Sequence, residues 1–197
     1  MTTPAFETLL NAARQTHADT PALQAFVAFP DDLTPQTVTP HDIPARKLMV
    51  EETAWPDTAL HPLAQAYINA ASDAHWRETY KDTDIGADFM DRFACYALIG
   101  PQAPWTSQTM FGFVVYMPAG LWYPWHHHPA EELYFVLAGE GEFLKHCEPS
   151  ETLRAGQASY HASGQSHALR THDHPIMAYV LWRNHFDTPP VWSKGRL

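Results

Sequence analysis

The sequence has few cysteines, which limits the cross-links and metal knuckles that it can form. Cys95 and Cys147 are the only 2 cysteines in 197 residues. They are too few and too far apart for a disulfide framework or a cysteine-based zinc knuckle. The sequence leaves a single bridge open, but so few cysteines favour a reducing compartment, and we expect a cytoplasmic protein.

The sequence also lacks the features of membrane and nucleic-acid-binding proteins. It has no run of 18 apolar residues, which excludes a membrane-spanning helix. Residues 1–7 show no basic region followed by an apolar one, so we expect no secretory signal. Lys and Arg number 12 against 22 Asp and Glu, a formal net charge of −10 that leaves no basic stripe for phosphates. We therefore expect neither a membrane nor a nucleic acid as a partner.

Apolar and aromatic residues are plentiful. Hydrophobic residues make up 45% of the chain and aromatic residues 13%, which is enough for a sizeable core. The 7 Trp indicate a core or a cavity built from rings. At this length we expect one domain, or one domain with a substantial extension.

Residues 1–92 are predicted to be mainly helical. Apolar residues recur at helical spacing between Phe6 and Ala13, and Pro21 can open a second short helix over residues 22–29. Residues 31–44 are proline-rich and predict a loop. An amphipathic stripe runs over residues 60–80, with a break near Ser72, and one more helical turn is expected between residues 86 and 93.

From residue 93 the apolar period changes to two, which predicts strands. Strand-like segments separated by turn residues cover 93–99, 111–117, 131–138, 142–146, 158–161, 167–170 and 176–182. Many short strands at regular spacing predict a mainly β fold that closes into a sandwich or barrel. The helical part has too little apolar content for its own core. We therefore expect residues 1–92 to be an extension packed on a barrel domain of residues 93–197.

Four residues are spaced as metal ligands: His126, His128, Glu132 and His167. Alternate side chains of a strand share a face, so His126 and His128 can point into one cavity while His127 points away. Pro129 cannot donate to a sheet ladder, so we expect the strand to turn there. Imidazole and carboxylate together suit one divalent ion such as Fe, Zn, Mn, Co or Ni. A solvated histidine-rich loop is the alternative interpretation.

These residues resemble the cupin superfamily. Its first motif, G-x5-H-x-H-x3-E-x6-G, is met by Gly120, His126, His128, Glu132 and Gly139. Its second motif is met by Gly156, Gly164 and His167, and departs at Ala162 and Thr171, where Pro and Asn are usual. Neither departure removes a ligand. The resemblance implies an antiparallel jelly-roll β-barrel with a metal site inside the barrel.

A narrower resemblance comes from the stretch Tyr123–Tyr134 together with the helical first half. That combination is similar to the cupin-type dimethylsulfoniopropionate lyases, most closely the DddQ group, and is specific only between Tyr123 and Trp182. It implies the ligands His128, Glu132 and His167, whereas His126 fits the general cupin pattern. It also implies two active-site tyrosines, Tyr134 near or on the metal and Tyr123, and a pocket tryptophan, Trp182.

The implied reaction suits these residue types. A metal can polarise the carboxylate of the zwitterionic substrate, so that a base removes the α-proton and dimethyl sulfide leaves, giving acrylate. Tyr134 as tyrosinate is the expected base, and its anion needs an adjacent cation because a free tyrosine titrates at about 10. A sulfonium cannot donate a hydrogen bond, so aromatic faces are its expected seat. The candidate rings are Tyr123, Trp122, Trp125 and Trp182, with packing in the core as the alternative for each.

Other interpretations stay open from the sequence. His161 can support a ligand from a second shell. The chain can be another metal-dependent cupin enzyme, such as a dioxygenase or an isomerase, or a metal-bearing small-molecule-binding protein without turnover. Neither the native metal nor a homodimer is decided.

Overall fold

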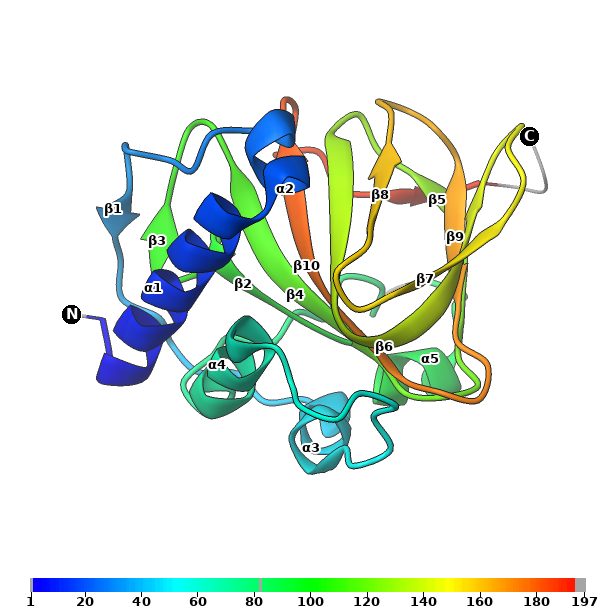
Figure 1. The fold of residues 1–197 in the computed structure, drawn as a ribbon, viewed down its shortest axis with the longest axis horizontal. Helices are drawn as coiled ribbons and strands as arrows, with labels where there is room; N and C mark the ends of the chain where they lie inside the picture. Colours follow the sequence, from blue (N-terminus) through cyan, green and yellow to red (C-terminus); the bar gives the residue numbers. More distant parts are fainter. Residues whose placement is uncertain (1, 82, 194–197) are drawn as a thin grey trace.

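The computed structural model describes residues 2–81 and 83–193 (Figure 1). Its helices, in chain order, are α1 Pro4–Asp19, α2 Pro21–Phe26, α3 Pro44–Glu51, α4 Pro62–Ala70 and α5 Ala87–Arg92. Helices α1 to α4 each begin at a proline, whose fixed φ and missing N–H suit the first helical position. The Thr3 side chain also accepts a hydrogen bond from the Phe6 backbone N–H, which caps α1.

The strands are short, apart from one. They are β1 Thr34–Pro35, β2 Ala94–Ile99, β3 Trp105–Thr106, β4 Phe111–Met117, β5 Trp122–His127, β6 Glu131–Lys145, β7 Glu151–Arg154, β8 Ala158–His161, β9 His167–Arg170, β10 Ile176–Arg183 and β11 Val191–Trp192. All strand pairs among the described residues are antiparallel except β2 with β3. This confirms the expected fold class, a mainly antiparallel jelly-roll with helices in the first half.

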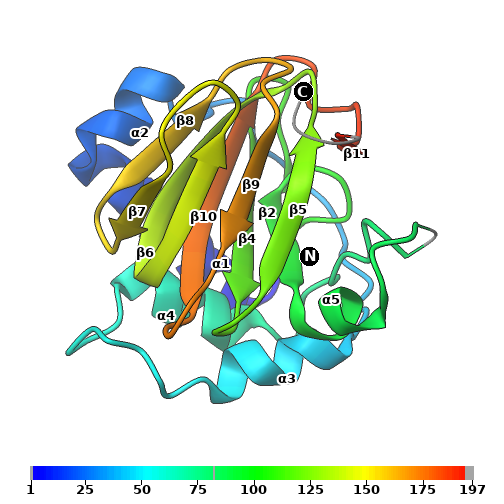
Figure 2. The ribbon, with the colours of Figure 1, turned by 90° about the vertical axis from the view of Figure 1, so that its right-hand side faces the viewer.

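Two sheets share β6, the long strand. Its residues 131–139 pair with β10 and β8 in the first sheet, which continues from β10 through β4, β2 and β3 to β1. Its residues 140–145 pair with β7 and β9 in the second sheet, which continues to β5 and β11. In Figure 2, β9 and β5 lie in front of β10, β4 and β2.

β6 passes from one sheet to the other at Gly139. This residue has φ +71°, and a Cβ there would lie 1.8 Å from the carbonyl oxygen of Pro175. Only glycine fits so close to another backbone in a left-handed conformation. This close approach explains sterically why the last position of the first cupin motif is a glycine.

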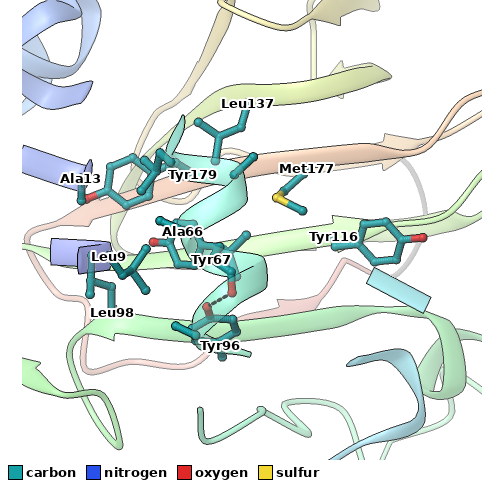
Figure 3. Packing of buried hydrophobic residues seen from close by; sticks show 14 of the residues in the cluster. Leu9, Ala13, Ala66, Tyr67, Tyr96, Leu98, Tyr116, Leu137, Met177 and Tyr179 are labelled. Atoms are coloured by element: carbon teal, nitrogen blue, oxygen red, sulfur yellow. Dashed lines mark hydrogen bonds between the residues drawn. The ribbon is translucent and has the colours of Figure 1, made fainter. Parts of the chain in front are cut away.

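Helices α1 and α4 cover the outer face of the first sheet. Leu133, Phe135 and Leu137 of β6 belong to the core cluster that these helices form with the sheet. Figure 3 shows Tyr67 of α4 within this cluster, with the Tyr96 hydroxyl of β2 donating a hydrogen bond to its backbone carbonyl oxygen. The residues between them in the sequence, such as Tyr134 and Val136, belong to a second cluster between the two sheets. The period of two that predicted a strand at residues 131–138 is confirmed.

Residues 76–80 close the side of the barrel between β2 and the second sheet. Trp76 forms an antiparallel bridge with Tyr96 of β2. Tyr80 stacks on Trp192 of β11, with ring centroids 4.3 Å apart. A segment from the first half of the chain therefore completes the wall of the barrel.

Some boundary predictions were wrong. The stripe expected to continue as helix from residue 60 to 80 ends as a helix at Ala70, because the chain then turns to pair with β2. The second helix ends at Phe26 rather than at residue 29, and α3 and β7 were not predicted. β6 also runs without a break through residues 139–141, where a turn was expected.

The division into residues 1–92 and 93–197 stays a prediction, and residues 1, 82 and 194–197 lie outside the described part. No helix within that part is both long and apolar enough to cross a membrane.

Candidate metal centre and adjoining pocket

The candidate ligands come together from both sheets inside the barrel. In the first sheet, Trp182 of β10, Glu132 of β6 and His161 of β8 are direct neighbours in register. In the second sheet, His126 of β5 is paired with His167 of β9. Residues paired in register project from the same face of a sheet, so each group forms a row. His128 lies between the two rows, in the turn from β5 to β6.

The centre is buried and compact. His126, His128, Glu132, His161 and His167 are each at most 2% exposed. The Oε2 atom of Glu132 lies 3.4 Å from Nε2 of His128 and 3.1 Å from Nε2 of His167. Ligand atoms of His126, His128 and His167 all lie within 4.8 Å of one another. The structure thus brings together all four residues predicted as metal ligands.

The backbone sets which nitrogen carries the proton in three of these histidines. Each Nδ1 lies at hydrogen-bond distance from a carbonyl oxygen: that of Pro124 for His126 (2.8 Å), of Ala130 for His128 (2.9 Å) and of Gln165 for His167 (2.8 Å). A carbonyl oxygen only accepts, so Nδ1 is the protonated nitrogen. Nε2 of each ring therefore keeps its lone pair and faces the interior.

Two of these lone pairs face an anion. Nε2 of His128 and Nε2 of His167 are buried and have no hydrogen-bond partner among the described residues. Their lone pairs and the Glu132 carboxylate repel one another at these distances unless a cation lies between them. Three neutral imidazoles and one carboxylate are the donor set that borderline divalent metals take. The residues present therefore fit a metal ion.

Trp182 and His161 hold the Glu132 carboxylate in place. The indole N–H of Trp182 donates to Oε1 at 2.6 Å, and Nδ1 of His161 lies 3.0 Å from Oε2. Because a carboxylate only accepts, His161 carries its proton on Nδ1, and its Nε2 accepts from the Ser159 hydroxyl at 3.3 Å. His161 is thus a donor to Glu132, in agreement with the supporting role expected of it.

The charges around Glu132 favour metal binding. Burial alone would raise the pKa of Glu132, but positive charge at His128 and hydrogen bonds from the surrounding histidines would outweigh burial and hold that pKa well below its usual range. With Nε2 of His128 and His167 unprotonated, a bound cation has to supply that positive charge. Burial lowers the pKa of His126 well below its ordinary value, and His167 adds to this effect. A carboxylate beside neutral imidazole is the protonation state that metals require.

A pocket adjoins the centre. Glu132 and His126 form one side of it. Aromatic rings form most of the rest: Tyr80, Phe93, Phe113, Tyr123, Tyr134 and Trp182. The pocket can therefore seat an apolar or cationic group against π faces next to the metal ligands.

Both predicted catalytic tyrosines line this pocket. The Tyr123 ring stacks on His126 with centroids 4.1 Å apart, and its hydroxyl is hydrogen-bonded to that of Tyr80. Tyr134 lies two residues after Glu132 on the same face of β6. Burial raises the pKa of each tyrosine well above its ordinary value, with further contributions from Tyr80 at Tyr123 and from the Glu132 charge at Tyr134.

Two of the predicted substrate-binding tryptophans do not line the pocket. Trp122 lies under the Arg170 guanidinium, whose carbon is 4.5 Å from the ring centroid. Trp125 lines a separate groove with residues of β6 and Arg170. The cause is a register shift in β5 between Tyr123 and His126, which puts these two residues on the same inner face. His127 points away from the ligands, as predicted, and contacts Ser193 at 2.9 Å.

Arg77 and Tyr80 are among the pocket residues that the sequence interpretation missed. Both belong to the segment that was expected to be helical. Their only signal in the sequence is a mixed polar and aromatic run after the break near Ser72, which suits a helix equally well.

Comparisons with known proteins agree with this geometry. The sequence pattern of the dimethylsulfoniopropionate lyase family matches residues 14–178. The chain is 52% identical over 190 residues to dimethylsulfoniopropionate lyase DddQ of Ruegeria pomeroyi, covering 96% of this chain and 94% of that protein. The crystal structure of DddQ from Ruegeria pomeroyi superposes with a TM-score of 0.95 and covers 98% of both chains. A crystal structure from work on the DMSP lyases RdDddP and RnDddQII is 33% identical, with a TM-score of 0.91 over 96% of this chain and 98% of that one.

Proposed function

The chain belongs to the dimethylsulfoniopropionate lyase family, and we propose that it cleaves dimethylsulfoniopropionate into dimethyl sulfide and acrylate with the help of one divalent metal ion. The observation that carries the metal requirement is the pair of buried Nε2 lone pairs, on His128 and His167, that face the Glu132 carboxylate. The aromatic pocket beside them suits a sulfonium, which cannot donate a hydrogen bond.

The residues that would hold the metal are His126, His128, Glu132 and His167. Their donor set suits Fe, Zn, Mn, Co or Ni without selecting among them. When bound, the ion supplies positive charge that acidifies the α-protons of a neighbouring carboxylate and lowers the pKa of a neighbouring phenol. Trp182 and His161 orient Glu132 for this role through their hydrogen bonds to its two oxygens.

Tyr134 is the residue that takes the proton. Its oxygen, once ionised, accepts the α-proton of the substrate. The electrons of the broken C–H bond form the new C=C bond, and the C–S bond breaks with its electron pair on sulfur. The products are neutral dimethyl sulfide and acrylate, so charge and atoms balance. Burial raises the pKa of Tyr134, so this step needs a positive charge close to the ring.

Tyr123 and Trp182 are the aromatic faces that we assign to the sulfonium end. Both line the pocket. Tyr123 has its hydroxyl tied to Tyr80, which fixes the orientation of its ring. The pocket geometry gives no support to a substrate-binding role for Trp122 or Trp125, which lie outside it.

Headspace detection of dimethyl sulfide from purified, metal-loaded protein tests the proposal. Tyr134→Phe keeps the ring but removes the oxygen that takes the proton, so turnover should fall by about a hundred-fold or more. Metal content should drop little. Tyr123→Phe should instead raise KM more than it lowers kcat.

Three outcomes would count against this assignment. A reversal of the two effects would make Tyr123 the base. Normal release by both variants would refute the tyrosinate mechanism. No release by the parent protein, with metal bound, would favour another cupin enzyme, such as a dioxygenase or an isomerase, or a binding protein without turnover.

We also infer a cytoplasmic setting, which both free cysteines, Cys95 and Cys147, support. A homodimer stays a prediction, and light scattering after size-exclusion chromatography would decide it.

A further inference from the structure

One basic side chain lines the pocket. Arg77 is the only Lys or Arg among the described residues that form its walls. Its backbone N–H donates to the carbonyl oxygen of Cys95 at 2.9 Å, which anchors it beside β2. Its guanidinium carbon lies 5.1 Å from the ring centroid of Phe111 and 5.8 Å from that of Phe113. The half-buried side chain thus lies over two interior rings.

The charge of Arg77 is not neutralised within the described part of the chain. The adjacent carboxylate, Glu78, is engaged by His41 and Lys81, each 3.1 Å from its Oε2. Burial raises the pKa of Cys95 to about 11, so this pocket thiol is uncharged at neutral pH. A guanidinium that lies over apolar rings and is not paired with an anion can form charge-assisted hydrogen bonds to a carboxylate.

Two aromatic rings connect Arg77 to the candidate metal centre. The Phe113 ring meets Trp182 edge to face, with centroids 5.6 Å apart, and Trp182 donates to Glu132. Arg77 and Glu132 are the formally charged residues among the described pocket walls. One wall is therefore cationic, and the metal ligands and aromatic rings occupy the others.

We propose that Arg77 binds the carboxylate of the substrate, and so selects zwitterionic sulfonium carboxylates over sulfonium compounds that lack a carboxylate. This inference rests on the proposed function of the same pocket. The guanidinium fork matches a carboxylate in shape and charge. A carboxylate has about four lone-pair sites, so a contact with Arg77 does not use up its capacity to interact with other positive charge in the pocket. The aromatic faces remain for the sulfonium end.

The test separates the two ends of the substrate by using one inhibitor for each. Propionate carries the carboxylate alone, and trimethylsulfonium carries the cation alone. In metal-loaded Arg77→Met, the inhibition constant of propionate should rise roughly 10- to 100-fold, the loss expected for a charge-assisted hydrogen bond. That of trimethylsulfonium should not rise. KM for dimethylsulfoniopropionate should rise by a similar factor, with a smaller change in kcat.

Lys81→Met is the matched control. It removes the same charge four residues away, from an exposed side chain that pairs with Glu78 and does not line the pocket. Its KM and its inhibition constants for propionate and trimethylsulfonium should stay within about twofold of those of the parent protein, because exposed ion pairs contribute little. Metal content and melting temperature should match the parent protein in both variants, which a general structural role of Arg77 would not allow.

Unchanged inhibition by propionate in Arg77→Met would overturn the proposal, even if KM rose. If Arg77→Met does not fold, Arg77→Lys takes its place, because it keeps a cation over the two rings but loses the fork. Propionate inhibition should then be several-fold weaker, and equal inhibition would overturn the proposal. If the parent protein releases no dimethyl sulfide, the proposed function fails by itself. Calorimetric titration of propionate into the parent protein and Arg77→Met still decides the role of Arg77.

Discussion

Replacing Trp182 by Phe should weaken metal binding without touching a metal ligand. The substitution keeps an aromatic ring beside His128, whose centroid lies 4.2 Å from that of Trp182. It removes the indole N–H that donates to Oε1 of Glu132 at 2.6 Å. Trp182 is 5% exposed and Glu132 1%, so water cannot readily replace the lost donor. The change therefore isolates one hydrogen bond to a candidate ligand.

The size of the effect follows from that hydrogen bond. Loss of a bond to a charged group costs about 1.5–3 kcal/mol, which lowers the melting temperature of the metal-free protein by roughly 3–12 °C. Loss of a group that orients a metal ligand costs about 10- to 100-fold in metal affinity. A competitive titration against a chromogenic chelator measures the affinity, and calorimetry measures the stability.

Trp76→Phe is the control for this experiment. Trp76 is 1% exposed, and its indole N–H donates to a neutral acceptor, the Ala71 carbonyl oxygen, at 2.9 Å. It should lose about 0.5–1.5 kcal/mol of stability and bind metal as the parent protein does. If Trp182→Phe bound metal as tightly as Trp76→Phe, Glu132 would not be a ligand oriented by Trp182, and the role assigned to that indole N–H would be refuted.

Three further predictions follow from the geometry. A His128→Ala, His167→Ala double variant should lose nearly all bound metal by elemental analysis, because both Nε2 atoms face one shared site; full occupancy would contradict that site. Gly139→Ala should lower the free energy of unfolding by more than about 3 kcal/mol in a urea titration, because its Cβ would overlap a backbone oxygen. Gly156→Ala, with φ +86° but nothing within 4 Å, should cost only about 1–2 kcal/mol. The Arg183 hydrogen bond lowers the pKa of Glu131 from 4.5 to about 2, so stability that is present above pH 4.5 should be lost as the pH falls towards 2. Glu131→Gln should flatten the dependence of the free energy of unfolding on pH in that range. An unchanged slope would contradict the shift.

The part of the site that was predictable from the sequence depends on the alternation of side chains between the two faces of a strand. On β6, every second residue faces the interior, so Glu132 and Tyr134 share a face while Leu133 packs under the helices. His126 and His128 are also two residues apart, so the same alternation predicts that they point into one cavity. Such patterns are visible in a sequence because they depend only on the pleat of a single strand.

The rest depends on contacts between segments far apart in the chain. A register shift in β5 puts Tyr123 on the inner face with His126 and leaves both Trp122 and Trp125 outside the pocket. Residues 76–80 leave a helical pattern because Trp76 pairs with Tyr96 of β2. Arg77 and Tyr80 reach the pocket only as a result of that pairing. Tertiary pairing overrides local propensity in both places.

The stack between Tyr80 and Trp192 has a consequence for the order in which the site is completed during synthesis. The candidate ligands and all three pocket tyrosines have been made by the time residue 167 is added. The ring that meets Tyr80 follows much later, in β11. The candidate metal ligands and the ring that stacks on Tyr80 therefore lie in different parts of the sequence. A chain that ends at Arg183 would carry every candidate metal ligand but not Trp192, the ring that stacks on Tyr80 in the wall of the barrel.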